Sequence, residues 1–266
     1  MIGQEELITK LKSYSINTLP HSIMLIGEKG CGKHTLAQEL STHFNVNLED
    51  ITTTLTLDKI TSIYLNPLPC FYLIDTTQIN ERQQNVMLKF LEEPLNNAYV
   101  ILLCENRHSL LGTILNRCVI FEFKPYTKEQ LSTFVKDQDN KDYILSICKT
   151  PGQAMSVNGK TLSKANSICD NIINKLSSKS MSLAGALTVI DFINFKDEYD
   201  KPDVNTFVSV LSDKLIKKYS TNKSNDAKYL YNILNCYINK LKDSRLSKIY
   251  LFESMIIDMW SMERKN

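Results

Sequence analysis

Apolar residues recur along this chain with two different periods, and the change between them falls near residue 160. Before that point, short apolar runs alternate with segments in which apolar residues return every three or four positions. The short runs have the length and composition of buried β-strands, and they are 22–27 (SIMLIG), 70–75 (CFYLID), 98–104 (AYVILLC) and 118–123 (CVIFEF). Helices are predicted between them, including 32–44 and 81–93. This alternation predicts an α/β fold with a parallel sheet that helices cover on both faces.

Beyond residue 160 the helical period is the only one. The segments 203–219, 226–242 and 246–260 carry apolar residues at spacings of three and four, which predicts a helical bundle. Seven of the eight glycines and six of the seven prolines lie before residue 160. We therefore expect three parts: an α/β core over 1–124, a small helical lid over 125–160, and an all-helical domain over 161–266.

Composition narrows the function only a little. Of the 266 residues, 31 are basic and 29 acidic, so the net charge of +2 gives no general attraction to nucleic acid. The seven cysteines form no C-x-x-C pair, so they predict neither a zinc site nor a disulfide framework. The N-terminus lacks the apolar core of a signal peptide, and no apolar run reaches 18 residues. These features predict a soluble, cytoplasmic protein that contacts no membrane.

The stretch GEKGCGKHT at 27–35 follows the first predicted strand and opens the first predicted helix. It has the frame of a phosphate-binding loop, in which backbone N–H groups surround the phosphates and a lysine reaches the β and γ oxygens. The residues that fit the frame are Gly27, Gly30, Gly32 and Lys33. A nucleotide site built on a P-loop is therefore predicted here.

That site departs from the frame at its magnesium ligand. His34 stands where the frame needs Ser or Thr, and Thr35 comes one residue later. One residue along a helix is a rotation of about 100°, so Thr35 cannot direct its hydroxyl where residue 34 points. A neutral imidazole is a poor ligand for magnesium, which prefers oxygen. The loop is thus compatible with phosphate binding, but we expect ATP and magnesium to bind weakly or not at all and the chain to hydrolyse no ATP by itself.

A second carboxylate position supports the same expectation. Asp75 ends the apolar run 70–75, where P-loop ATPases place a magnesium-binding aspartate. Thr76 follows it, and a threonine cannot act as a general base at neutral pH. The alternative interpretation of Asp75 is a cap at the end of a strand.

The middle of the chain carries a more specific pattern. NVMLKFLEEP (85–94), followed by YVILLCENRHSLLGTILNRC (99–118), resembles the bacterial clamp-loader AAA+ family, whose pattern reads N-A-L-L-K-x-L-E-E-P and then L-L-P-T-I-x-S-R-C. IGQEEL, LPHSIMLIG and FEFKPYTKEQL are similar to the same family. The resemblance covers residues 1 to about 160 and extends loosely to 245–260. Within the family, the delta-prime subunits of DNA polymerase III are the most similar.

The resemblance implies an AAA+ core, a lid and a C-terminal collar, in a subunit of a hetero-oligomeric, pentameric ring that loads the sliding clamp on primer-template DNA. It implies that Arg117 acts as an arginine finger, reaching the ATP of a neighbouring subunit. It places a second sensor arginine at Gly152, which cannot fill that role, and the first sensor within 104–106. The four-cysteine zinc module of some members has no counterpart here, so no metal is expected.

Three alternatives remain open from the sequence. Arg117 can instead pair locally before the strand that follows it. The chain can be an active AAA+ ATPase in which Thr35 or water replaces the missing hydroxyl. It can also be a DNA-binding initiator or helicase-loading module, although it has neither a basic face nor a helix-turn-helix.

Overall fold

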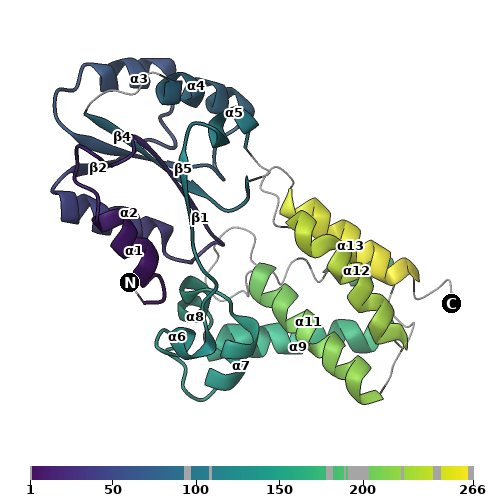
Figure 1. The fold of residues 1–266 in the computed structure, drawn as a ribbon. Helices are drawn as coiled ribbons and strands as arrows, with labels where there is room; N and C mark the ends of the chain where they lie inside the picture. Colours follow the sequence, from purple (N-terminus) through teal and green to yellow (C-terminus); the bar gives the residue numbers. More distant parts are fainter. Residues whose placement is uncertain are drawn as a thin grey trace. The chain divides into compact units, whose positions relative to one another are not determined.

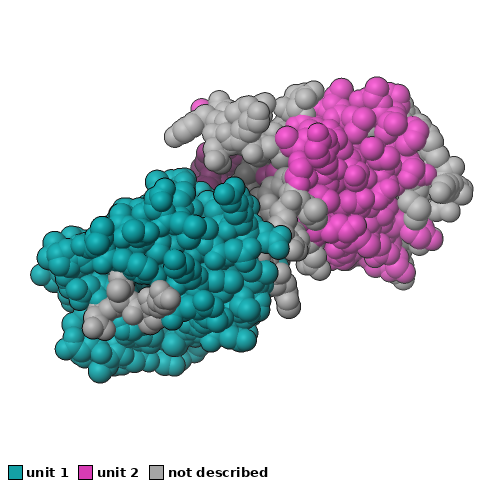
Figure 2. All heavy atoms as spheres, turned by 90° about the horizontal axis from the view of Figure 1, so that it is seen from above, with its two compact units in different colours: residues 1–130, 150–152 teal, residues 131–149, 153–266 magenta. Residues whose placement is uncertain are grey.

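The computed structural model describes residues 2–92, 97–107, 110–177, 182–188, 190, 204–222, 225–241 and 247–262. They divide into two compact units, coloured separately in Figure 2. Unit 1 comprises residues 1–130 and 150–152, and unit 2 comprises 131–149 and 153–266. The expected division at 124 and 160 stays a prediction. Along the described residues, no helix combines the length and apolarity needed to cross a bilayer.

Unit 1 contains the predicted parallel α/β sheet (Figure 1). Its elements are α1 (Glu5–Lys12), β1 (Ser22–Ile26), α2 (Lys33–Phe44), β2 (Asn47–Asp50), α3 (Leu57–Tyr64), β3 (Cys70–Asp75), α4 (Glu81–Glu92), β4 (Ala98–Cys104), α5 (Gly112–Leu115) and β5 (Val119–Glu122). The strand order is β2-β3-β4-β1-β5, and every neighbouring pair is parallel. The α/β fold predicted from the alternating pattern is thereby confirmed.

Alternate residues of the central strands supply two separate cores. On β1, Ile23 and Leu25 pack with α1 and α2, whereas Met24 packs with α3, α4 and α5. Figure 1 shows these two helical layers on opposite faces of the sheet. Because both faces are covered, every residue of β1 and β4 is buried, as the apolar runs require.

The sequence pattern missed one strand, β2. Its residues NLED are mostly exposed, because β2 lies at the edge of the sheet and pairs only with β3. Backbone hydrogen bonds rather than apolar burial hold this strand, so no hydrophobic run marks it. An ion pair between Glu49 and Lys59 of α3 adds a side-chain contact on its outer part.

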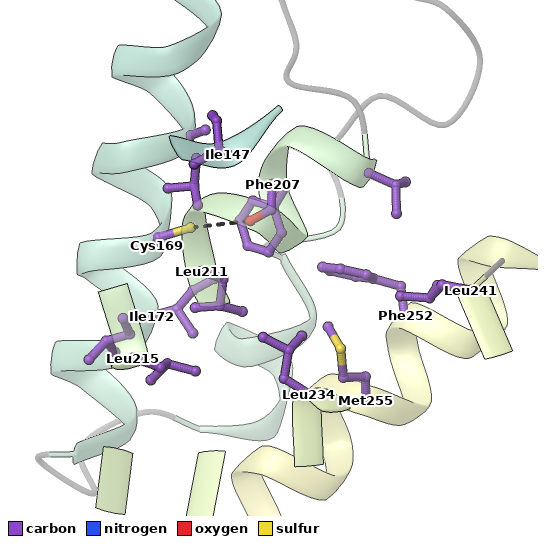
Figure 3. Close-up of a cluster of buried hydrophobic side chains, with 14 of the residues drawn as sticks. Ile147, Cys169, Ile172, Phe207, Leu211, Leu215, Leu234, Leu241, Phe252 and Met255 are labelled. Atoms are coloured by element: carbon purple, nitrogen blue, oxygen red, sulfur yellow. Dashed lines mark hydrogen bonds between the residues drawn. The ribbon is translucent and has the colours of Figure 1, made fainter. Parts of the chain in front are cut away.

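The predicted helices after residue 160 are confirmed in unit 2. Its elements, with α6 and α8 shared between the units, are α6 (Lys128–Ser132), α7 (Lys141–Ile147), α8 (Pro151–Ser156), α9 (Gly159–Ser177), α10 (Leu183–Leu187), α11 (Val204–Asn222), α12 (Asn225–Leu241) and α13 (Lys248–Met262). Figure 3 shows the core that they enclose, with Phe207 of α11 facing Phe252 of α13. The two rings meet edge to face, with centroids 5.4 Å apart.

Candidate functional site

The predicted phosphate loop lies where β1 ends and α2 begins. Gly30 and Gly32 both adopt positive φ angles, 82° and 102°, so this turn requires residues without a Cβ. Gly32 is the N-cap of α2, and no side chain caps the helix there. The loop therefore has the backbone geometry that presents N–H groups to an anion at the start of a helix.

Lys33 is buried, and its amine is already engaged within the loop. It donates to the carbonyl oxygen of Gly27 at 2.5 Å and to that of Glu28 at 3.1 Å. Two buried thiols lie within reach of its charge. Burial raises the pKa of Cys31 and of Cys104, and the positive charge of Lys33 partly opposes both shifts. The Lys33 side chain thus bonds backbone carbonyls of its own loop.

His34 and Thr35 are both exposed on the first turn of α2. Within the part of the chain that the structure describes, neither side chain is hydrogen-bonded to Asp75 at the carboxyl end of β3. The side chain at position 34 is an imidazole, which supplies no oxygen in place of the hydroxyl that magnesium prefers.

Asp75 ends β3, and its carboxylate is engaged by the turn that follows. Oδ1 accepts from the backbone amide and the hydroxyl of Thr77, at 3.0 and 2.8 Å. Oδ2 accepts from the side-chain amide of Gln78 at 3.1 Å. The Asp75 amide in turn donates to the hydroxyl of Thr52 at 2.8 Å. These bonds form a cap at the strand end, with two donors on Oδ1 and one on Oδ2.

The next position carries no base. Thr76 is buried, and its hydroxyl donates to the carbonyl of Leu103 on β4 at 2.9 Å. Its side chain is thus anchored to the neighbouring strand. Among the described residues, no three His, Cys, Asp or Glu side chains gather as a metal site. The donor set around the loop does not fit magnesium, although the loop backbone fits a phosphate.

Residues 104–106, where the resemblance places the first sensor, follow β4. Cys104 is fully buried, and Asn106 is exposed. The carbonyl of Cys104 accepts the amide of Gly27 at 3.0 Å, which ties the end of β4 to the start of the loop. His108, which follows, lies outside the described residues.

Arg117 lies just after α5, with its guanidinium held on two sides. Nη1 donates to the carbonyl of Thr113 at 2.9 Å, and Nη2 lies 2.6 Å from Oε1 of Glu92, at the end of α4. The Arg117 side chain is still 35% exposed. Sequence reasoning had named local pairing as the alternative for Arg117, but it did not identify Glu92 as the partner. Glu93 lies outside the described residues.

The P-loop and Arg117 lie at opposite ends of two neighbouring strands, β1 and β5. In the register of β1 and β5, Ile23 pairs with Val119 and Ile26 with Glu122. Gly27 follows the carboxyl end of β1, whereas Arg117 precedes the amino end of β5. At 3.3 Å per residue, about 20 Å separates the two positions along the strands. An arginine side chain cannot span that distance, so Arg117 does not serve the loop of its own chain.

Sequence reasoning also missed a contact to the loop from a distant segment. The hydroxyl of Thr150 donates to the carbonyl of Lys29 at 3.0 Å, and the amide of Gly152 donates to the carbonyl of Gly30 at 2.9 Å. These donors belong to unit 1 although they are about 120 residues away in sequence. The only sequence signal for this contact is a glycine on each side, Gly30 in the P-loop frame and Gly152 at the second-sensor position.

The sequence is similar to subunits of DNA polymerase III. Residues 46–127 match the family model described as DNA polymerase III, delta subunit. The chain is 26% identical over 171 residues to DNA polymerase III subunit gamma of Buchnera aphidicola, covering 51% of this chain and 47% of that protein. It is 22% identical over 156 residues to DNA polymerase III subunit delta' of Haemophilus influenzae, covering 52% and 48%. The match thus spans about half the length of these relatives.

A solved structure extends the likeness to nearly the whole chain. The DNA polymerase III gamma subunit-related protein of Thermotoga maritima superposes with a TM-score of 0.51 at 16% identity, covering 97% of this chain and 100% of that one. At this identity the likeness concerns the fold alone. The sheet and loop thus define a P-loop AAA+ core. More narrowly, the predicted resemblance to the bacterial clamp-loader AAA+ family is confirmed by the sequence matches.

Proposed function

We propose that this chain is a delta-prime-like subunit of a DNA polymerase III clamp loader. In this proposal it occupies one position of a hetero-oligomeric, pentameric ring and does not hydrolyse ATP itself. Its Arg117 completes the ATP site of the adjacent motor subunit, and the ring loads the sliding clamp on primer-template DNA. The collar formed by 161–266 holds the subunit in the ring.

The observation that carries the proposal is the separation of two features within one sheet. Arg117 lies about 20 Å from the loop of its own chain, counted at 3.3 Å per residue along β1 and β5. A permanently charged fork of donors is the side chain best suited to bind phosphate oxygens. Exposed at an edge remote from its own loop, Arg117 is suited to a phosphate carried by another molecule.

The state of the chain's own site supports the same division of roles. Lys33 bonds carbonyl oxygens of the loop, Asp75 caps a turn, and Thr76 replaces a general base. We therefore infer that magnesium and ATP bind weakly or not at all here.

Reconstitution tests the proposal directly. The ring is assembled from this chain, its motor subunits and the clamp, and DNA-stimulated phosphate release is measured. Arg117→Ala is expected to lower the turnover at one site by about 10³-fold or more, the range typical of arginine fingers. Lys33→Ala in this chain is expected to leave ring turnover unchanged.

Two other results would replace the proposal. Steady turnover by the isolated chain that Lys33→Ala abolishes would make it an active ATPase. Salt-sensitive DNA binding by the isolated chain would favour the initiator or helicase-loading alternative. Unchanged ring turnover in Arg117→Ala would remove the finger role.

A further inference from the structure

Three successive carbonyl groups of the P-loop accept hydrogen bonds from outside the loop. The carbonyl of Lys29 accepts the hydroxyl of Thr150 at 3.0 Å, and the carbonyl of Gly30 accepts the amide of Gly152 at 2.9 Å. The carbonyl of Cys31 accepts the hydroxyl of Tyr126 at 2.7 Å. Two later segments of the chain, at Tyr126 and at 150–152, therefore bond these three carbonyl groups of the loop.

The contact between Gly30 and Gly152 is one of backbone against backbone. A Cβ added at Gly152 would lie 2.7 Å from Cα of Gly30, and one added at Gly30 would lie 3.1 Å from Cα of Gly152. No flexible side chain stands between them that could move aside. The contact restricts position 152 to glycine, and the φ of 82° restricts position 30.

The segment that makes the contact belongs to a different unit from its neighbours in sequence. Residues 150–152 belong to unit 1, whereas the residues on both sides of them, 131–149 and 153–266, belong to unit 2. Thr150 is buried, with 3% of its surface exposed. Unit 1 therefore holds this short segment by bonds to the loop.

We propose that the P-loop of this chain is an anchor for residues 150–152 and holds its shape without nucleotide. Fixing the carbonyls of Lys29, Gly30 and Cys31 on the outside fixes the planes of the intervening peptides. Lys33 donates to the carbonyls of Gly27 and Glu28, so its ammonium group has hydrogen-bond acceptors within the loop when no phosphate is bound. Backbone packing then accounts for glycine at positions 30 and 152. The proposal concerns the loop alone and does not depend on the function of Arg117.

Hydrogen exchange on the full chain tests the anchor. The probes are the peptide 27–33, the backbone amide of residue 152, and β4 as a reference within the same unit. Gly152→Ala is expected to speed exchange of residue 152 and of the loop about tenfold or more, because a backbone bond is lost and the Cβ overlaps Gly30. Exchange in β4 is expected to stay as it is in the wild type.

Gly112→Ala is the matched control, because a Cβ at Gly112 meets nothing within 4 Å. It is expected to leave the exchange of all three probes unchanged. Thr150→Val removes only the hydroxyl bonded to Lys29, and it covers the case in which Gly152→Ala fails to fold. It is expected to speed exchange of the loop about fivefold, as for one lost hydrogen bond.

Addition of magnesium and ATP to the wild type separates the anchor from an ordinary nucleotide loop. The anchor predicts exchange of 27–33 that does not change with nucleotide. Slowing of that exchange by ATP would overturn the proposal, since the loop would then take its order from a ligand. Unchanged exchange in Gly152→Ala, or in Thr150→Val, would overturn it as well, and so would equal acceleration in β4.

Discussion

Oε1 of Glu92 lies 2.6 Å from Nη2 of Arg117, joining the last turn of α4 to the second residue after α5. With the bond from Nη1 to Thr113, two edges of the guanidinium are fixed while part of it faces solvent. Because both partners are partly exposed, the pair stabilises the fold by no more than about 1 kcal/mol. The main effect that we expect of the pair is to orient the guanidinium of Arg117.

Glu92→Gln tests that orienting role and rests on the proposed function. In a reconstituted ring we expect turnover at the site that Arg117 completes to fall about tenfold, because without the Glu92 carboxylate the guanidinium is less well preorganised. KM for ATP should change little, and Glu92→Asp should restore part of the rate. Arg107, paired with the exposed Glu122, provides the control, and Arg107→Ala should leave turnover near that of the wild type. If Arg117→Ala abolishes turnover and Glu92→Gln does not alter it, Glu92 has no positioning role.

His34→Thr restores the missing hydroxyl without restoring the rest of the site. We expect the isolated chain to show no ATP turnover above background. Asp75 still caps its turn and Thr76 still supplies no base. Phosphate release measured beside wild type and Lys33→Ala checks this. Turnover in His34→Thr that disappears on adding Lys33→Ala would mean that one residue alone had silenced the site.

Phe207→Ala should destabilise unit 2 severely. The ring is fully buried against Phe252, and its removal leaves a cavity in the helical core of Figure 3. Such substitutions lower the free energy of unfolding by about 3–5 kcal/mol. Tyr250→Ala is the control, because that side chain is 70% exposed, and a change within about 0.5 kcal/mol is expected. Urea denaturation followed by circular dichroism measures both, and equal effects would contradict the core assignment.

Tyr237 gives unit 2 a dependence on alkaline pH. Burial, followed by the hydrogen bond to Asp258 and its charge, raises the pKa of Tyr237 from 10.0 to about 12. Below pH 10 the phenol is protonated whether the chain is folded or not, so its contribution to stability is fully present. As the pH rises from 10 towards 12, the unfolded chain ionises first, and that contribution is lost.

Tyr237→Phe should remove this part of the pH profile. The difference in unfolding free energy between wild type and variant is expected to be constant below pH 10 and to shrink above it. Denaturation at pH 8, 10 and 11.5 measures it. A difference that grows with pH would show that the folded phenol ionises more readily than the unfolded one.

Apolar runs predicted four strands; β1 and β4 are buried throughout and β3 nearly so, whereas the edge strand β5 buries only Phe121. The runs located 70–75 and 98–104 to the residue, β1 with one extra residue at its end, and β5 with one extra residue at each end. β2 escaped because its side chains are polar and its stability comes from pairing with β3. Its partner is 23 positions later in the chain, and no local pattern encodes that pairing.

The frame of the loop could be read from sequence because each of its glycines and Lys33 has a local reason. For Asp75 the sequence predicts either a metal ligand or a cap at the strand end, and the structure shows the cap. The sequence does not predict which residues bond Arg117 or the carbonyls of the loop. Glu92 lies 25 positions from Arg117, and the contact of Gly152 with Gly30 also joins residues far apart in the chain, so no local pattern points to either partner.

The discontinuity of unit 1 has a consequence for its synthesis. Residues 1–130 emerge from the ribosome before residues 150–152 do, so the carbonyls of Lys29 and Gly30 at first lack their bonds to Thr150 and Gly152. At 5–20 residues per second, translation from 130 to 152 takes on the order of one to four seconds. During that interval the nascent sheet can form while its loop remains open to solvent. A cut between 131 and 149 would likewise separate the loop from its last partners, although every strand would survive it.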